Sequence, residues 1–121
     1  MKICITSEGK NLDSQVDARF GRCQYFILVD SDTMELEVIT NEAGSGGAGI
    51  QAGQLMADKG VGAVLTGNVG PNAFRTLDAA GIKAVTGVSG TIKEAVEKYK
   101  KGGFPEALDG PSVDSHFGMN K

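Results

Sequence analysis

The sequence predicts an α/β domain built on a five-stranded mixed sheet, and three observations lead to that prediction. Strand-like segments occupy the first 40 residues, separated by a polar stretch without helical periodicity. From residue 50 onward, amphipathic stretches alternate with short apolar ones, which is typical of β-α units. Glycine is enriched, at 18 of 121 residues, and gathers at the predicted ends of elements. We therefore expect one domain over residues 1–105 and an irregular tail over residues 106–121.

The first part of the chain predicts three strands. The first strand opens the sequence, and a polar loop over residues 7–22 follows it. The second segment is strongly apolar, and the third alternates in part, as in an edge strand joined to the second by a hairpin. The charged Glu35 and Glu37 on this third segment suit an edge that resists pairing. Strands are therefore expected at residues 2–6, 24–30 and 35–40.

Three helices and two further strands are expected in the rest of the domain. Gly60 fits the C-cap of the first helix, and Pro71 fits the first position of the second. Thr91 and Glu94 form a capping box that starts the third helix. Helices are therefore expected at residues 50–59, 71–80 and 91–101, with buried strands at residues 61–66 and 82–86.

The order of these elements predicts the topology of the sheet. Right-handed crossovers place the first, fourth and fifth strands parallel. The second strand then runs antiparallel beside the first, so that the strand order is 3-2-1-4-5 with helices on both faces. This is the ribonuclease-H-like arrangement. Ligands of such sheets bind in the crevice beyond the carboxyl ends of the parallel strands.

Composition argues against several classes of function. The net charge is −3 and the isoelectric point is about 5.1, so no basic field is available for a nucleic acid. The longest apolar run covers residues 26–29, far short of the roughly 20 residues that span a bilayer. The start of the chain resembles a strand and not a signal peptide. We therefore expect a cytoplasmic protein that contacts neither nucleic acid nor membrane.

Catalysis is not expected either. Nucleases of the ribonuclease-H-like fold hold metal ions with carboxylates, one of them on the first strand, and residues 2–6 carry none. The single histidine leaves little room for a Ser/His/Asp set. We therefore expect a binding protein and not an enzyme.

Glycine-rich loops are expected to surround the crevice. Glycine before a helix lets an anion reach the unpaired N–H groups of the first turn. The alternative is that these glycines only form tight turns, because no P-loop or dinucleotide motif is present. The candidate ligand-binding residues from these loops are Gly47, Gly49, Gly67, Asn68, Gly70 and Asn72.

The two cysteines are expected to be free thiols in a reducing compartment. Cys4 lies in the central strand, where core packing is the expected role. Cys23 lies where the polar loop meets the second strand, and the nearby Arg19 and Arg22 are expected to lower its pKa and favour the metal-binding thiolate. The alternative for Cys23 is a half-buried structural thiol.

The tail contains a short echo of the polar loop. Residues 113–118 match residues 16–21 at four of six positions. Each copy places a cation-capable residue before Phe-Gly, and in the tail that residue is His116. One hypothesis is that the tail closes over the crevice and adds the His116 imidazole as a metal ligand beside Cys23. The alternatives are a chance match and a solvated end of the chain.

Three segments carry a family resemblance. They are residues 16–23 (VDARFGRC), 47–52 (GAGIQA) and 66–74 (TGNVGPNAF). They closely resemble the dinitrogenase iron–molybdenum cofactor biosynthesis family, which includes NifX, NafY and the carboxy-terminal domain of NifB. The resemblance covers roughly residues 1–105. It departs from several relatives at residues 45–47, where they have a histidine and this chain has Ser-Gly-Gly.

The resemblance implies a ribonuclease-H-like fold and a role in carrying a metal–sulfur cluster. The cargo implied is the iron–molybdenum cofactor, its iron–sulfur precursor or a simpler iron–sulfur species. The partners implied are a cluster donor and a cluster acceptor, with the protein itself a monomer or weak homodimer. One alternative is a small-molecule or nucleotide-binding module that uses the same crevice. The other is an enzyme or a partner-binding scaffold.

Overall fold

The computed structural model describes residues 1–41 and 48–102. Five strands and three helices alternate along this part of the chain in the predicted order. They are β1 (Lys2–Ser7), β2 (Tyr25–Asp30), β3 (Leu36–Thr40), α1 (Ala48–Asp58), β4 (Ala63–Leu65), α2 (Pro71–Ala79), β5 (Lys83–Val85) and α3 (Ile92–Lys100).

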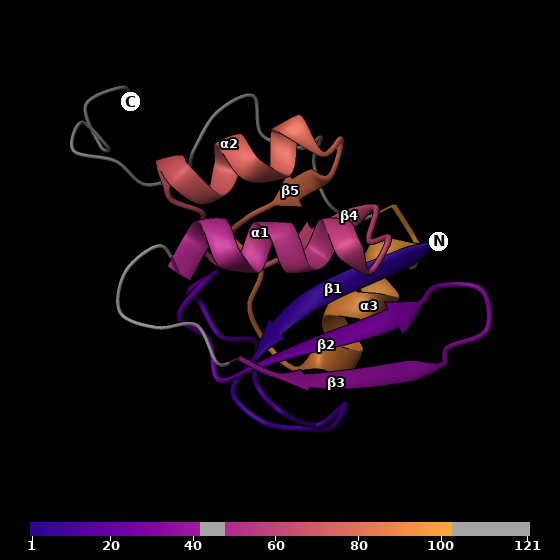
Figure 1. Ribbon diagram of the computed structural model, residues 1–121. Coiled ribbons are helices and arrows are strands. Elements are labelled where there is room, and N and C mark those ends of the chain that lie inside the picture. Colours follow the sequence, from indigo (N-terminus) through magenta and orange to yellow (C-terminus); the bar gives the residue numbers. More distant parts are fainter. Residues whose placement is uncertain (42–47, 103–121) are drawn as a thin grey trace.

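The strands form one mixed sheet in the order β3-β2-β1-β4-β5 (Figure 1). The central strand β1 pairs antiparallel with β2 and parallel with β4. β2 pairs antiparallel with β3, and β4 pairs parallel with β5. This confirms the strand order predicted from the sequence, including the antiparallel second strand.

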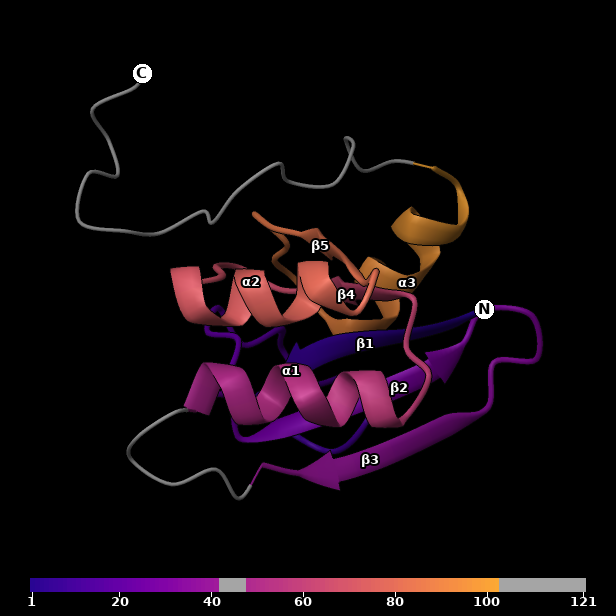
Figure 2. The same ribbon diagram turned by 45° about the horizontal axis from the view of Figure 1, so that its top comes forward.

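The sheet is covered on both faces. α1 and α2 lie side by side on one face, and α3 lies on the other (Figures 1 and 2). The alternation of side chains along β1 divides the core accordingly: Cys4 joins the cluster under α1 and α2, whereas Ile3 and Ile5 join the cluster under α3. All three side chains are fully buried. The prediction of helices on both faces is confirmed.

The helix ends follow the local signals in the sequence. Gly60 has a φ of +74°, a left-handed conformation that costs glycine little, and the N–H of Val61 donates to the carbonyl of Met56 at 3.1 Å. At the start of α3, Glu94 N–H donates to Thr91 Oγ1 at 3.1 Å, and Thr91 N–H donates to Glu94 Oε1 at 2.9 Å. The predicted C-cap and the predicted capping box are both confirmed.

Strands β4 and β5 are shorter than the sequence predicted. Val61, expected in β4, donates its N–H to the Met56 carbonyl of α1 at 3.1 Å. Ile82, expected in β5, donates to the Leu77 carbonyl of α2 at 2.9 Å. Backbone groups that close the preceding helix therefore shorten both strands. None of the described helices is both long and apolar enough to cross a membrane.

Candidate functional site

The loops that leave the carboxyl ends of β1, β4 and β5 join into one surface, as the topology predicted. The N–H of Phe20 donates to the Asn68 carbonyl at 3.2 Å, which joins the β1–β2 loop to the β4–α2 loop. The N–H of Val16 donates to the Gly90 carbonyl at 2.8 Å, which joins it to the β5–α3 loop. Gly87 N–H donates to the Gly67 carbonyl at 3.0 Å. The three loops are therefore fixed to one another by their backbones.

Two buried threonines form the floor of this surface. Thr6 lies near the end of β1 and Thr66 directly follows β4, and both are fully buried. Their hydroxyl oxygens lie 2.7 Å apart, and Thr6 Oγ1 donates to the Asp17 carbonyl at 2.6 Å. We call Thr6 and Thr66 the hydroxyl pair. It attaches the β1–β2 loop to two neighbouring strands.

Asp17 holds Arg19 in place above the hydroxyl pair. The Asp17 side chain is almost fully buried, and its Oδ1 accepts hydrogen bonds from the Arg19 backbone N–H at 3.0 Å and from Arg19 Nε at 3.1 Å. Arg19 Nη2 donates to Asp17 Oδ2 at 3.3 Å. The hydrogen bond to Asp17 is also the main reason why the pKa of Arg19 is raised. Arg19 is therefore paired with a carboxylate and remains partly exposed.

Gly67 permits the close approach of two loops. A Cβ at this position would lie 2.7 Å from the Cα of Ala18 and 2.8 Å from its carbonyl oxygen. Backbone atoms cannot move aside as the end of a flexible side chain can. The glycine predicted for this site is thus required here by packing.

Cys23 lies beneath the surface and is not activated as the sequence predicted. Its side chain is 3% exposed, and burial, followed by the negative charge of Asp17, raises its pKa to about 12. Hydrogen bonds from backbone groups lower it only in part. The predicted effect of Arg19 and Arg22 is therefore wrong: Arg19 pairs with Asp17, Arg22 is exposed, and the thiol is protonated at neutral pH. Burial also raises the pKa of Cys4 well above its ordinary value.

The start of α2 follows the β4–α2 loop of this surface and has no side-chain cap. Gly70 is the N-cap residue, Pro71 follows, and no side chain accepts a hydrogen bond from the first turn. Asn72 is exposed, and its Oδ1 accepts a hydrogen bond from Arg75 at 2.7 Å. Asn68 is also exposed. Among the described residues, no side chain therefore caps the N–H groups at this helix end, which belong to the predicted anion site.

The remaining predicted residues are divided between α1 and the undescribed segments. Gly49 lies in the first turn of α1. Gly47 and His116, with the repeated tail segment, lie outside the described residues. Within residues 1–41 and 48–102, no three His, Cys, Asp or Glu side chains are grouped so as to hold a metal ion.

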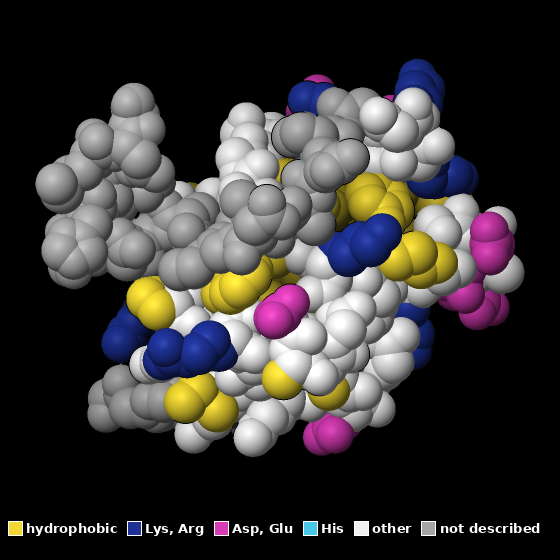
Figure 3. Space-filling view, turned by 90° about the horizontal axis from the view of Figure 1, so that it is seen from above, with side chains coloured by type: hydrophobic (Ala, Val, Ile, Leu, Met, Phe, Trp, Pro, Cys, Tyr) yellow, Lys and Arg dark blue, Asp and Glu magenta, His cyan; other side chains and the backbone are white. Residues whose placement is uncertain are grey.

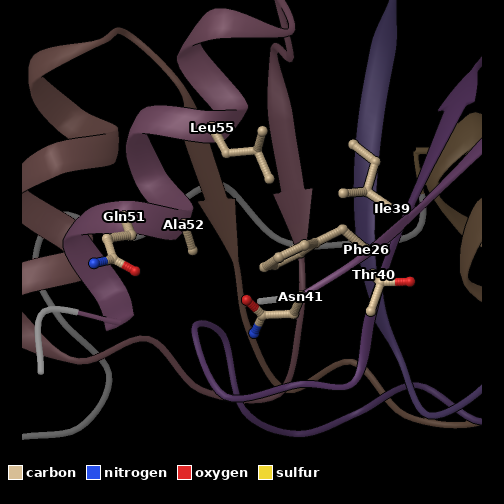
Figure 4. A pocket seen from close by; sticks show the side chains of 7 residues that line it. All are labelled: Phe26, Ile39, Thr40, Asn41, Gln51, Ala52 and Leu55. Atoms are coloured by element: carbon tan, nitrogen blue, oxygen red, sulfur yellow. The ribbon is translucent and has the colours of Figure 1, made fainter. Parts of the chain in front are cut away.

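A pocket of about 260 Å³ lies on the α1 side of the sheet, and one residue of its lining, Asn41, contacts the backbone of Cys23. Asn41 links the two, because its Nδ2 donates to the carbonyls of Gly21 and Cys23 at 2.9 Å each. Figure 4 shows Phe26 and Leu55 facing each other across the pocket, with polar side chains near its lower rim. The lining residues are Phe26, Ile39, Thr40, Asn41, Gln51, Ala52 and Leu55.

Sequence reasoning missed this pocket and the hydroxyl pair. Asn41 precedes a glycine-rich stretch of the sequence, but nothing marked its amide as the link to Cys23. Asp17 and Thr66 each lie within a family-like segment, and this was the available signal for them. Seen from above, the described surface carries basic and acidic side chains interspersed with hydrophobic ones, without a field of one sign (Figure 3).

Comparison with known proteins gives relatives of similar length. The chain is 44% identical to the orange protein of Desulfovibrio gigas, whose structure was solved in the apo form, with a TM-score of 0.88 over 93% of this chain and 96% of that one. It is 37% identical to a NifB-related protein of Thermotoga, with a TM-score of 0.74 over 87% and 91% of the two chains. An uncharacterised protein of Methanocaldococcus jannaschii is 30% identical over 107 residues, covering 84% of this chain and 87% of the relative.

A match to a family model assigns the chain to a protein family. The model described as dinitrogenase iron-molybdenum cofactor matches residues 1–102, which is the greater part of the chain. This range contains the three segments that carried the resemblance in the sequence. The chain therefore belongs to the dinitrogenase iron–molybdenum cofactor family.

Proposed function

We propose that the protein is a carrier for an iron–sulfur-type cluster, with no catalytic step of its own. The cargo is the iron–molybdenum cofactor, its precursor or a simpler iron–sulfur species. The observation that carries the proposal is the position of Cys23. Its thiol shares a core cluster with Val69 and Ala73, which flank the start of α2 where no side chain caps the helix.

The chemistry of this position suits a metal–sulfur cluster. Sulfides and thiolates of a cluster carry negative charge, and N–H groups aimed at them stabilise and tune the bound state. The uncapped start of α2 supplies such groups together with the positive end of the helix dipole. The Cys23 sulfur would supply a metal ligand. Arg22 and the outer part of Arg19 add positive charge at the surface.

Burial of Cys23 has a consequence for loading. A thiol with a pKa near 12 must lose its proton when it binds a metal. Loading through Cys23 therefore releases a proton, and the apparent affinity rises with pH. The cluster must also reach a side chain that is only 3% exposed, so residues above Cys23 have to move during loading.

Anaerobic reconstitution with ferrous iron and sulfide tests the proposal. We expect the wild type to acquire sulfide-dependent visible absorption, and Cys23→Ser to lose most of it. Cys4→Ser is the matched control, because Cys4 is the other buried thiol of the same core cluster and should affect mainly stability. Equal loading of wild type and Cys23→Ser would contradict the role of Cys23, and a wild type that binds no cluster would contradict the carrier function.

The pocket beside α1 favours a second candidate, a small-molecule or nucleotide-binding module. Its apolar wall and polar rim are typical of small-ligand sites, although about 260 Å³ is at the small end of their range. Leu55→Trp would fill the pocket, whose lining does not include Cys23. We expect this variant to keep its capacity for cluster loading. Loss of a copurifying organic ligand in Leu55→Trp, with no cluster in any variant, would instead favour the second candidate.

A carrier needs a donor and an acceptor protein. We propose that both act in the cytoplasm, where a reducing environment preserves free thiols and sulfide. Pull-down with loaded and unloaded protein tests this: a donor should prefer the unloaded form and an acceptor the loaded form.

A further inference from the structure

The outer edge of β3 is unpaired in the described part of the chain, because β3 is the last strand on its side of the sheet. This edge is also apolar. Among the described residues, two of the five exposed large hydrophobic side chains lie on β3: Leu36 and Val38, which are 42% and 39% exposed. A third, Met34, lies in the turn that precedes the strand. A strand edge with these properties is a template for pairing with another strand.

A lysine compensates part of the charge that would protect this edge. The sequence predicted that Glu35 and Glu37 would hinder pairing. In the structure Glu35 precedes β3, and Glu37 Oε2 accepts a hydrogen bond from Lys59 Nζ at 2.8 Å. This ion pair lowers the pKa of Glu37 and places a cation beside its carboxylate.

The pairing of β2 and β3 defines which groups face outward. The N–H of Asp30 donates to the Glu35 carbonyl, and the N–H of Asn41 donates to the Gln24 carbonyl, both at 3.0 Å. Hydrogen-bonded residues alternate in an antiparallel ladder, so the odd-numbered residues of β3 face β2. The N–H and C=O groups of Leu36, Val38 and Thr40 therefore point away from the sheet.

We propose that this edge pairs with β3 of a second copy of the chain, antiparallel about a twofold axis at Val38. This register pairs Leu36 with Thr40 of the second copy, Thr40 with its Leu36, and Val38 with its Val38. All three outward-facing residues are then hydrogen-bonded, and the exposed Leu36 and Val38 side chains of both copies meet on one face. The inference is independent of the proposed cluster site.

The neighbouring registers are less favourable. An axis at Glu37 would leave Thr40 without a partner in β3. An axis at Ile39 would leave Leu36 without a partner in β3. The self-complementary edge thus favours a second copy over an unrelated strand. A five-residue edge is smaller than a standard interface, so we expect a dissociation constant between about 1 µM and 1 mM.

Charge swapping at the axis tests the proposal. Val38→Lys and Val38→Glu each place two like charges opposite each other in the dimer, while the exposed site tolerates either side chain in the monomer. Sedimentation velocity at about 10 µM to 1 mM should show a wild-type dimer that weakens at least tenfold in each variant. An equimolar mixture of the two variants should form dimers again, because Lys then faces Glu.

The control is Ile50→Lys, which adds the same charge at a position on α1 with the same exposure of 39%. It should dimerise like the wild type. Restoration in the mixture also excludes misfolding as the cause of the loss. A wild type that stays monomeric throughout, a mixture that stays monomeric, or an equal loss in Ile50→Lys would each overturn the proposal.

Discussion

The starts of α2 and α3 lie at the same end of the sheet, and each helix follows a parallel strand, yet they are built differently. α3 begins with a capping box in which the Thr91 and Glu94 side chains bind backbone N–H groups. α2 begins at Gly70 and Pro71 with no side-chain cap. The core beneath them differs as well. The cluster under α3 is free of cysteine, whereas both described cysteines lie in the cluster under α1 and α2.

This difference supports the proposal that the two helix ends have different roles. A capped helix end satisfies its own N–H groups and has little to offer a ligand. An uncapped end beside a glycine-rich loop leaves them available to a ligand. Both helices complete the fold, but only the start of α2 combines available N–H groups with a thiol. The following experiments test this contrast.

The largest expected effect is a loss of stability at high pH, caused by Cys23 in the core cluster under α1 and α2. Cys23 has an ordinary pKa of 9.0, and the folded protein raises it to about 12. Above pH 9 the unfolded chain loses this proton while the folded one keeps it, so the free energy of unfolding falls by about 1.4 kcal/mol per pH unit towards pH 12. Urea denaturation at pH 8 to 11 should show a steeper decline for the wild type than for Cys23→Ala. If the free energy of unfolding declines equally with pH in both proteins, Cys23 is not the source of the alkaline sensitivity.

The next effect concerns Gly67, which lets the loop before α2 touch Ala18. Gly67→Ala should destabilise the protein by about 1–3 kcal/mol, because the new Cβ meets backbone atoms. Gly70→Ala is the control three residues away, where a Cβ meets nothing within 4 Å. Thermal denaturation of both variants checks this prediction. It fails if the two substitutions have the same effect.

Removal of the α3 cap should have a smaller effect and no influence on binding. Thr91→Ala loses the hydrogen bond to the Glu94 N–H and should cost about 1 kcal/mol. Cluster loading should remain at the wild-type level once the protein is kept below its melting temperature. Reduced loading in this variant would mean that the two helix ends are not separate in function.

Addition of a cap to α2 should give the smallest change in stability and the clearest change in function. Gly70→Ser has space for its side chain and a compatible φ of −79°, so it should stabilise the unloaded protein by about 0.5 kcal/mol. The same hydroxyl competes with a ligand for the N–H groups of α2. We expect weaker cluster loading than in Gly70→Ala, and equal loading would show that these N–H groups do not contact the cargo.

The strand order and the helix ends could be predicted from the sequence because their signals are local. Gly60 and the Thr91–Glu94 capping box each act within a few residues of where they stand, and both are confirmed. The alternation of strands and helices then left few topologies consistent with right-handed crossovers. The lengths of β4 and β5 were predicted less accurately. The N–H groups of Val61 and Ile82 donate to carbonyls of the preceding helices, and this depends on how each turn packs.

The position of the candidate site could be predicted from the sequence, but the pKa of its thiol could not. The sequence placed Cys23 near two arginines, and this suggested a thiolate. The structure turns Arg19 toward Asp17 and buries the Cys23 thiol. The pKa of a thiol depends on side chains that surround it from distant segments, such as Val69 and Ala73. The pocket beside α1 likewise needs Phe26, Ile39 and Leu55 from three elements, and no local motif predicts that they lie close together.

The hydroxyl pair has a consequence for how the chain folds during synthesis. Thr6 and Thr66 are 60 residues apart in sequence but neighbours in the sheet. On the ribosome, β1 can pair with β2 soon after both emerge, whereas its second neighbour, β4, appears only much later. Until then one edge of the most central strand has no partner, which exposes the nascent chain to wrong pairing. Closing this long loop is an entropically costly step, so the hydroxyl pair and the pairing of β1 with β4 are expected to form together and late.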